Sequence, residues 1–168
     1  MKVTVAYASK CVKALQNDIA ILYRRQNQNK TYTEIQGVPA VIPEYDFQST
    51  QECIENMENR VARIKHAINV HNTTTCLPGF DDLTIDQALV KLSQLNNRLR
   101  VLDEMRTLPI RVLDNGFGAA RQQIQYTVAN YSPQHANGEY ERVYAAIQKL
   151  QLAIDKSNNT DIFEVEDT

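Results

Sequence analysis

The sequence has little glycine or proline, few cysteines and no tryptophan. Glycine and proline supply five residues each of 168, which excludes collagen-like and low-complexity chains. The three cysteines, Cys11, Cys53 and Cys76, are odd in number and show no C-x-x-C spacing. We therefore expect no disulfide framework and a reducing, cytoplasmic location. No apolar run reaches about 18 residues, so we expect no membrane-spanning helix and no membrane partner.

The charge is nearly balanced. The net charge is -2 and the isoelectric point is 5.9, so there is no overall attraction to nucleic acid, and we expect no nucleic-acid partner. Apolar residues make up 43% of the chain, enough to build a core at this length. We predict one domain over residues 1–160, followed by an acidic flexible tail at 161–168.

Apolar residues recur at alternating gaps of three and four in four stretches of the chain. This spacing places them on one face of a helix and favours near-antiparallel packing of long helices. The four stripes are Val5, Ala8, Val12, Leu15, Ile19 and Leu22; Phe47, Thr50, Ile54, Met57, Val61, Ile64, Ile68 and His71; Ile85, Ala88, Leu92, Leu95, Leu99 and Leu102; and Tyr140, Val143, Ile147, Leu150 and Ile154.

Capping signals mark two helix starts. Thr84 followed by Gln87 is a capping-box pattern. The second helix can begin at Ser49, which has Glu52 three residues on, or one turn earlier at Asp46.

Two connections carry strand signals. Tyr32, Thr33 and Ile35 suit an extended strand, and Ile124, Tyr126 and Val128 alternate with polar residues. The predicted fold is thus α+β and mainly α: four long helices in an antiparallel bundle, with a small antiparallel β-element from residues about 31–42 and 108–131.

Several short segments, in the same order along the chain, resemble the septicolysin-like family of small helical proteins from bacteria and their phages. The similar segments are residues 61–74, ending IKHAINVHNTTT; the helix start LTIDQA at 83–88; the late strand at 124–128; and residues 152–158, LAIDKSN. The resemblance implies a mainly helical fold. It supplies no catalytic residues, and we do not carry over the lytic activity that the family name suggests.

Candidate catalytic and metal-binding groups have structural interpretations. His66 and His71 are five residues apart and diverge on a helix, so they favour no zinc site, and His71 suits a buried, hydrogen-bonded position. Asp81, Asp82 and Asp86 could bind a divalent cation, but helix capping and the helix dipole also explain them. We expect no metal, no cofactor and no catalytic centre.

Between residues 92 and 148 arginine is used and lysine is absent. Arginine can grip phosphate or carboxylate, and nearby tyrosines can cover a ring. Surface ion pairs with Asp103, Glu104 and Asp114 explain the same arginines. The predicted ligand-binding residues are Arg98, Arg106, Arg111, Arg121, Tyr126, Tyr131, Asn72 and His71.

The sequence leaves three functions open. The first is a non-enzymatic homo-oligomer that captures a small anionic, nucleotide-type ligand, with phage sequestration of host signalling nucleotides as one version by analogy. The second is a structural or protein-interaction helical module without a ligand, suggested by apolar residues outside the stripes such as Ile21, Leu89 and Val101. The third is a metal-dependent hydrolase that uses the acidic residues near 81–86.

Overall fold

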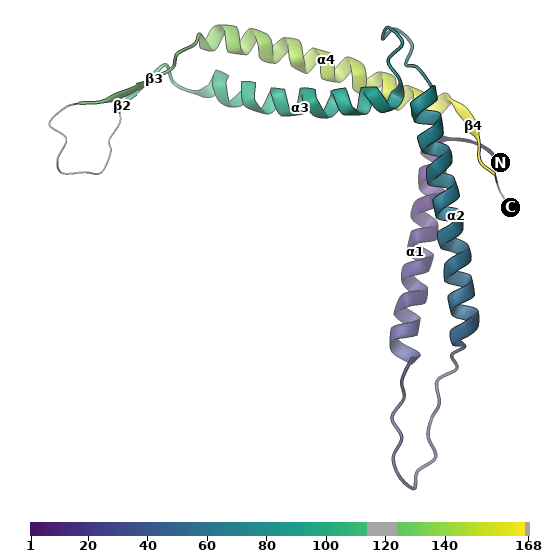
Figure 1. The fold of residues 1–168 in the computed structure, drawn as a ribbon. Helices are drawn as coiled ribbons and strands as arrows, with labels where there is room; N and C mark the ends of the chain where they lie inside the picture. The colour runs from purple at the N-terminus through teal and green to yellow at the C-terminus, as the bar shows by residue number, and fades with distance from the viewer. Residues whose placement is uncertain (114–123, 167–168) are drawn as a thin grey trace. The chain divides into compact units, whose positions relative to one another are not determined.

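The protein is mainly helical, with four long helices and two small antiparallel strand pairs, as the sequence predicts (Figure 1). This computed structural model describes residues 1–113 and 124–166. The elements in chain order are β1 (Lys2–Thr4), α1 (Val5–Asn29), α2 (Phe47–Thr74), α3 (Ile85–Thr107), β2 (Arg111–Leu113), β3 (Tyr126–Val128), α4 (Pro133–Thr160) and β4 (Ile162–Glu164). No helix among the described residues combines the length and the apolar character needed to cross a membrane.

The chain divides into two compact units, where the sequence predicted a single domain over residues 1–160. Unit 1 comprises residues 1–75 and 156–168, and unit 2 comprises residues 76–155. Each unit is built on one helix pair, so the packing of all four helices into one bundle stays a prediction.

In unit 1, α1 and α2 run antiparallel. The Tyr23 hydroxyl donates to Glu58 over 3.3 Å, and the Gln51 amide donates to Gln26 over 2.7 Å. The predicted stripes form the seam, in which Val5, Ala8, Val12, Ile54 and Ile64 are buried. Phe47, the first residue of α2, is an exception at 62% exposed. Asp46 caps α2 by accepting from the Ser49 amide over 3.1 Å, which selects the earlier of the two predicted starts.

The flexible tail predicted at 161–168 is corrected by the structure, because β4 lies within it. β4 pairs antiparallel with β1, with Val3 opposite Phe163. Val3 and Val165 are 7% and 3% exposed and join the core cluster that contains Ile64. The apolar face of the β1–β4 pair therefore packs both ends of the described chain against α1 and α2.

In unit 2, α3 and α4 form a second antiparallel pair. Ile85 and Ala88 near the start of α3 are buried with Leu150 and Ile154 late in α4. The capping box is confirmed: the Thr84 side chain accepts from the Gln87 amide, and the Gln87 side chain accepts from the Thr84 amide.

The predicted β-element is found only in part. β2 and β3 pair antiparallel inside the predicted 108–131 region, with Arg111 opposite Val128. Residues 31–42, predicted to be the other half, form no strand. They have a turn instead, in which the Val38 amide donates to Ile35 over 3.0 Å and Gly37 has a φ of 83°. Pro39 has no N–H to donate to a ladder, which weakens any pairing across this turn.

Candidate functional site

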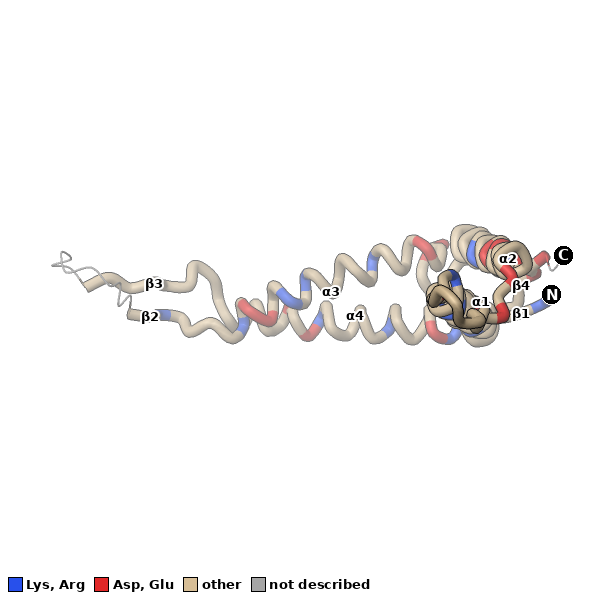
Figure 2. Tube along the Cα trace, turned by 90° about the horizontal axis from the view of Figure 1, so that it is seen from below, with Lys and Arg blue, Asp and Glu red and all other residues tan. Residues whose placement is uncertain are grey.

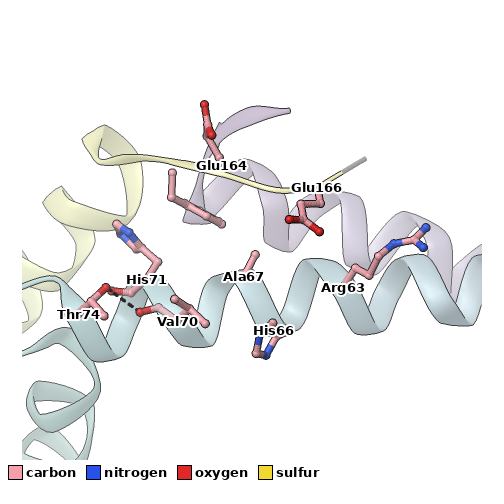
Figure 3. Close-up of a pocket in the computed structure, with 9 residues that line it drawn as sticks. Arg63, His66, Ala67, Val70, His71, Thr74, Glu164 and Glu166 are labelled. Carbon is pink, nitrogen blue, oxygen red and sulfur yellow. Dashed lines mark hydrogen bonds between the residues drawn. The ribbon is translucent and has the colours of Figure 1, made fainter. Parts of the chain in front are cut away.

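A hollow of about 450 Å³ lies between α2 and β4 in unit 1 (Figure 3). We call it the α2–β4 hollow. Its volume is in the range of small-molecule sites. It is lined by Arg63, His66, Ala67, Val70, His71, Thr74, Phe163, Glu164 and Glu166.

The helix period and the strand pleat place these residues together. The α2 residues recur at gaps of three and four, so they form one flank of the helix. β4 crosses above this flank, and Figure 3 shows the His71 and Ala67 side chains rising from α2 toward it. Successive strand residues alternate between faces, so Phe163 and Val165 lie on the core side with Val3. β4 thus contributes Phe163 to the hollow from its inner face and Glu164 from its outer face.

His71 is the most constrained polar group in the hollow. Its ring is stacked on Phe163 with centroids 4.9 Å apart and planes inclined by 21°. Its Nδ1 atom is 3.2 Å from the Thr75 hydroxyl oxygen. The side chain is only 9% exposed, and its Nε2 atom is buried without a hydrogen-bond partner among the described residues.

An unpaired ring nitrogen at this depth is costly, because a buried polar group loses its bonds to water. When the Thr75 hydroxyl donates to Nδ1, the ring proton lies on Nε2. That N–H is then a donor with no acceptor. In the other tautomer, with the proton on Nδ1, the Nε2 atom is instead an acceptor with no donor.

The charged groups around the hollow carry both signs. Arg63 forms no ion pair among the described residues, whereas Glu164 is 3.4 Å from Lys2 on the exposed side of the strand pair. Figure 3 shows Glu166 between Ala67 and Arg63, far along α2 from His71. Within the described ranges no three His, Cys, Asp or Glu side chains come together as a metal site.

The arginines predicted as ligand contacts on α3 are held by acidic partners. Arg98 and Arg142 both bond Glu139, at 3.0 and 2.7 Å. The Arg142 hydrogen bond lowers the pKa of Glu139, and the Glu139 bond raises the pKa of Arg142. Figure 2 shows acidic and basic residues interspersed along α3 and α4. These contacts favour the ion-pair interpretation of these arginines.

Arg106 is also held by an acidic partner. It bonds Asp103 within its own helix, with the closest approach at 2.7 Å. That hydrogen bond raises the pKa of Arg106. Its guanidinium carbon also lies 4.1 Å from the centre of the Tyr140 ring.

The remaining predicted residues lie in separate places. Arg111 stacks 3.7 Å above the Tyr126 ring on the β2–β3 ribbon, and the Tyr131 hydroxyl donates to the Met105 carbonyl over 2.7 Å. His71 and Asn72 belong to unit 1, and Arg121 lies outside the described residues. The structure therefore brings Arg111 and Tyr126 together but does not join the eight residues into one site.

The aspartates predicted as possible metal ligands and the predicted ligand contact Asn72 remain. Asp81 and Asp82 occupy the left-handed backbone region with φ of 35° and 58°, which aspartate tolerates in turns. The Oδ1 atom of Asn72 is buried without a partner, and nothing in the structure explains it. Sequence reasoning missed Arg63 and Phe163. The signal that could have found Phe163 is the largely apolar run IFEV at 162–165. Such a run is unusual in a flexible tail, which is what the sequence analysis predicted for these residues.

Comparison with known proteins supports the fold and leaves the activity open. No protein family and no curated protein matches the sequence, so the resemblance to the septicolysin-like family stays a prediction. A crystal structure of a functionally unknown conserved protein from Corynebacterium diphtheriae matches with a TM-score of 0.65. The match covers 98% of this chain and 100% of that one at 13% identity. At this identity the likeness shows the fold alone.

Proposed function

We propose that the protein is a non-enzymatic, homo-oligomeric binding protein of the cytoplasm that captures a small anionic ligand in the α2–β4 hollow. The observation that carries this proposal is the unpartnered Nε2 atom of His71, a nine-tenths buried residue that lines the same hollow as Arg63, which forms no ion pair among the described residues. A phosphate or carboxylate oxygen would accept from His71 at one end of the hollow, and Arg63 would attract the negative charge.

The proposal moves the predicted site away from the arginines of α3. Those arginines would have to break bonds to Glu139 or Asp103 before they could hold a ligand. His71, the one predicted residue in the hollow, has no such bond to break at Nε2. A nucleotide-type ligand is one candidate, because its phosphate supplies the anion and its ring can contact Ala67 and Val70.

The test is an NMR titration of the full chain with inorganic phosphate, benzoate and adenosine monophosphate, observing the ring nitrogens of the three histidines. At least one probe should shift the His71 resonances and leave those of His135, an exposed residue of α4, unchanged. His71→Gln should abolish the binding measured by calorimetry, and His135→Gln is the matched control. Silence of His71 toward all three probes would overturn the proposal.

A second candidate is a protein-interaction module. It is favoured by the exposed apolar residues in the segment that joins α1 to α2, where Val41 is 88% and Ile42 is 67% exposed. Surface that apolar, gathered in one segment, is typical of a contact with another polypeptide. A stable complex formed by wild-type protein and lost in Val41→Asp would support this function.

A further inference from the structure

The outer edge of β4, which faces away from β1, has no strand partner. Met1 and Val165 exchange two backbone hydrogen bonds, of 2.6 and 2.8 Å. Hydrogen-bonded and non-hydrogen-bonded pairs alternate along an antiparallel ladder. Phe163 is therefore bonded to β1, whereas the N–H and C=O groups of Ile162 and Glu164 point away from β1. Among the described strands none but β1 pairs with β4, so these backbone groups lie along an open edge.

The open backbone groups complement those of a second copy of the same strand. When two β4 strands run antiparallel with their Phe163 residues opposite one another, each Ile162 lies opposite the Glu164 of the other copy. Both of these are hydrogen-bonded pairs, because residues 162 and 164 are the ones whose groups point outward. The two strands can thus exchange four backbone hydrogen bonds. A register centred on Glu164 would instead place two carboxylates directly opposite, which is destabilising.

Phe163 supplies an apolar contact in this register. Its ring is half-buried on the inner face of β4 and lines the α2–β4 hollow. Across the twofold axis the two Phe163 residues form a non-hydrogen-bonded pair, with Cβ atoms about 4.5–5.5 Å apart. Aromatic pairs at such positions stabilise a sheet. On the outer face Ile162, which is 67% exposed, would be covered by the Glu164 side chain of the other copy.

The flank of α2 below this edge extends the contact beyond a three-residue strand. The α2 residues that line the hollow run from Arg63 to Thr74, a length of about 17 Å. Ala67 and Val70 lie at the middle of this flank, and Val70 is 48% exposed. The twofold axis that pairs two β4 strands also turns the two α2 flanks toward each other. Each hollow then opens onto the hollow of the other copy.

The other edge of the strand pair is less suited to pairing. β1 ends where α1 begins, and the Thr4 hydroxyl is already used as the N-cap that accepts from the Tyr7 amide. Lys2 also lies on β1, and lysine is a residue that protects sheet edges. On β4 the charge of Glu164 is paired with Lys2 over 3.4 Å. Figure 3 shows the Glu164 carboxylate directed away from α2, so it does not cover the flank below.

We propose that two copies of the protein pair through the outer edges of β4 and form a continuous antiparallel sheet in the order β1–β4–β4–β1. Both copies use the same surface, so the contact closes as a dimer. The inference rests on the homo-oligomeric part of the proposed function and names its interface. It also makes Phe163 of each copy a neighbour of the hollow of the other.

Sedimentation velocity of the full chain tests the interface. Wild type should sediment as a dimer. Glu164→Pro removes one outward N–H from each copy without touching a bond to β1. Two of the four bonds between the copies are then lost, and the dissociation constant of the dimer should rise at least about tenfold. Glu164→Gln is the matched control, because it keeps the N–H and removes only the charge. It should dimerise within about threefold of wild type.

Amide hydrogen exchange tests the register in wild type alone, so it decides even where the proline variant fails to fold. At concentrations that favour the dimer, the amides of Ile162 and Glu164 should exchange at least about tenfold more slowly than in a dilute sample. The Phe163 amide, which is bonded to β1 in either state, should change less.

Three results would each overturn the β4 interface. They are wild type that stays monomeric, Glu164→Pro that dimerises as wild type does, and exchange at Ile162 and Glu164 that does not depend on concentration. Titrating phosphate, benzoate and adenosine monophosphate separates the two proposals. A shift at His71 without a β4-dependent dimer would overturn the interface alone. A dimer that is lost in Glu164→Pro, without any shift at His71, would overturn anion capture alone.

Discussion

The imidazole of His71 is stacked on the ring of Phe163, with the two centroids 4.9 Å apart. This contact joins the last turns of α2 to β4, a three-residue strand about 90 residues further along the chain. Phe163 also packs against the core cluster of unit 1. The stack therefore couples the position of β4, which borders the hollow, to the orientation of its main hydrogen-bonding group.

Phe163→Ala should destabilise unit 1 and weaken anion binding together. Removing a half-buried aromatic ring should cost about 1–3 kcal/mol of the free energy of unfolding, measured by urea denaturation. Ile162→Ala is the control, because Ile162 is 67% exposed and should stay within about 0.5 kcal/mol of wild type. Equal stability of the two variants would show that the ring does not hold β4 in place.

Thr84→Ala should remove the N-cap of α3. The substitution deletes the acceptor for the Gln87 amide and one half of the capping box. The expected loss is about 1 kcal/mol, measured as a lower melting temperature. Thr84→Ser keeps the hydroxyl and should retain most of the stability; a serine variant as unstable as the alanine variant would argue against capping.

Glu139 should contribute to stability at neutral pH and lose that contribution in acid. Its pKa in the folded state is lowered, chiefly by the hydrogen bond from Arg142 and also by the charge of Arg98. A group with a depressed folded pKa stabilises the protein above its unfolded pKa, and the effect disappears as the pH falls through the folded value. The melting temperatures of wild type and Glu139→Gln should therefore differ at about pH 7 and converge once the pH falls below the lowered folded pKa of Glu139.

Salt supplies the control for this prediction. The side chains of Glu139 and Arg142 are 43% and 65% exposed, so added salt should screen their attraction and narrow the gap at neutral pH. A gap that persists in acid would assign the effect of Glu139→Gln to packing and not to charge.

The sequence predicts the four helices well because their signals are local. The stripe from Ile85 to Leu102 and the Thr84–Gln87 box both lie within one element, and the physics that forms them needs no distant partner. Local signals alone do not choose between two possible caps. Asp46 and Ser49 both suit the N-cap of α2, and the structure shows that Asp46 is the cap.

The strand pairs and the site depend on contacts that no local pattern contains. β1 and β4 have three residues each and lie at opposite ends of the chain. Neither has a strand pattern of its own, because each is defined by its pairing with the other, in which Val3 lies opposite Phe163. Residues 31–42 show the converse, a strand pattern with no partner in the described chain. The sequence predicts Arg98 and Arg106 of α3 as ligand contacts because it does not show that Glu139 and Tyr140 of α4 lie next to them. The structure shows that Arg98 bonds Glu139 and that Arg106 lies over the Tyr140 ring.

Ile64→Ala should open the hollow from below without a direct contact to it. Ile64 is 2% exposed and packs in the same cluster as Val165, the residue after β4. The truncation should cost about 2–5 kcal/mol and speed hydrogen exchange at β4 more than in α3, because α3 belongs to the other compact unit. Leu150→Ala, in the core of unit 2, is the matched variant and should speed exchange in α3 first. If Ile64→Ala loosened α3 as much as β4, the two units would unfold as one, and the position of β4 would not depend on the unit 1 core alone.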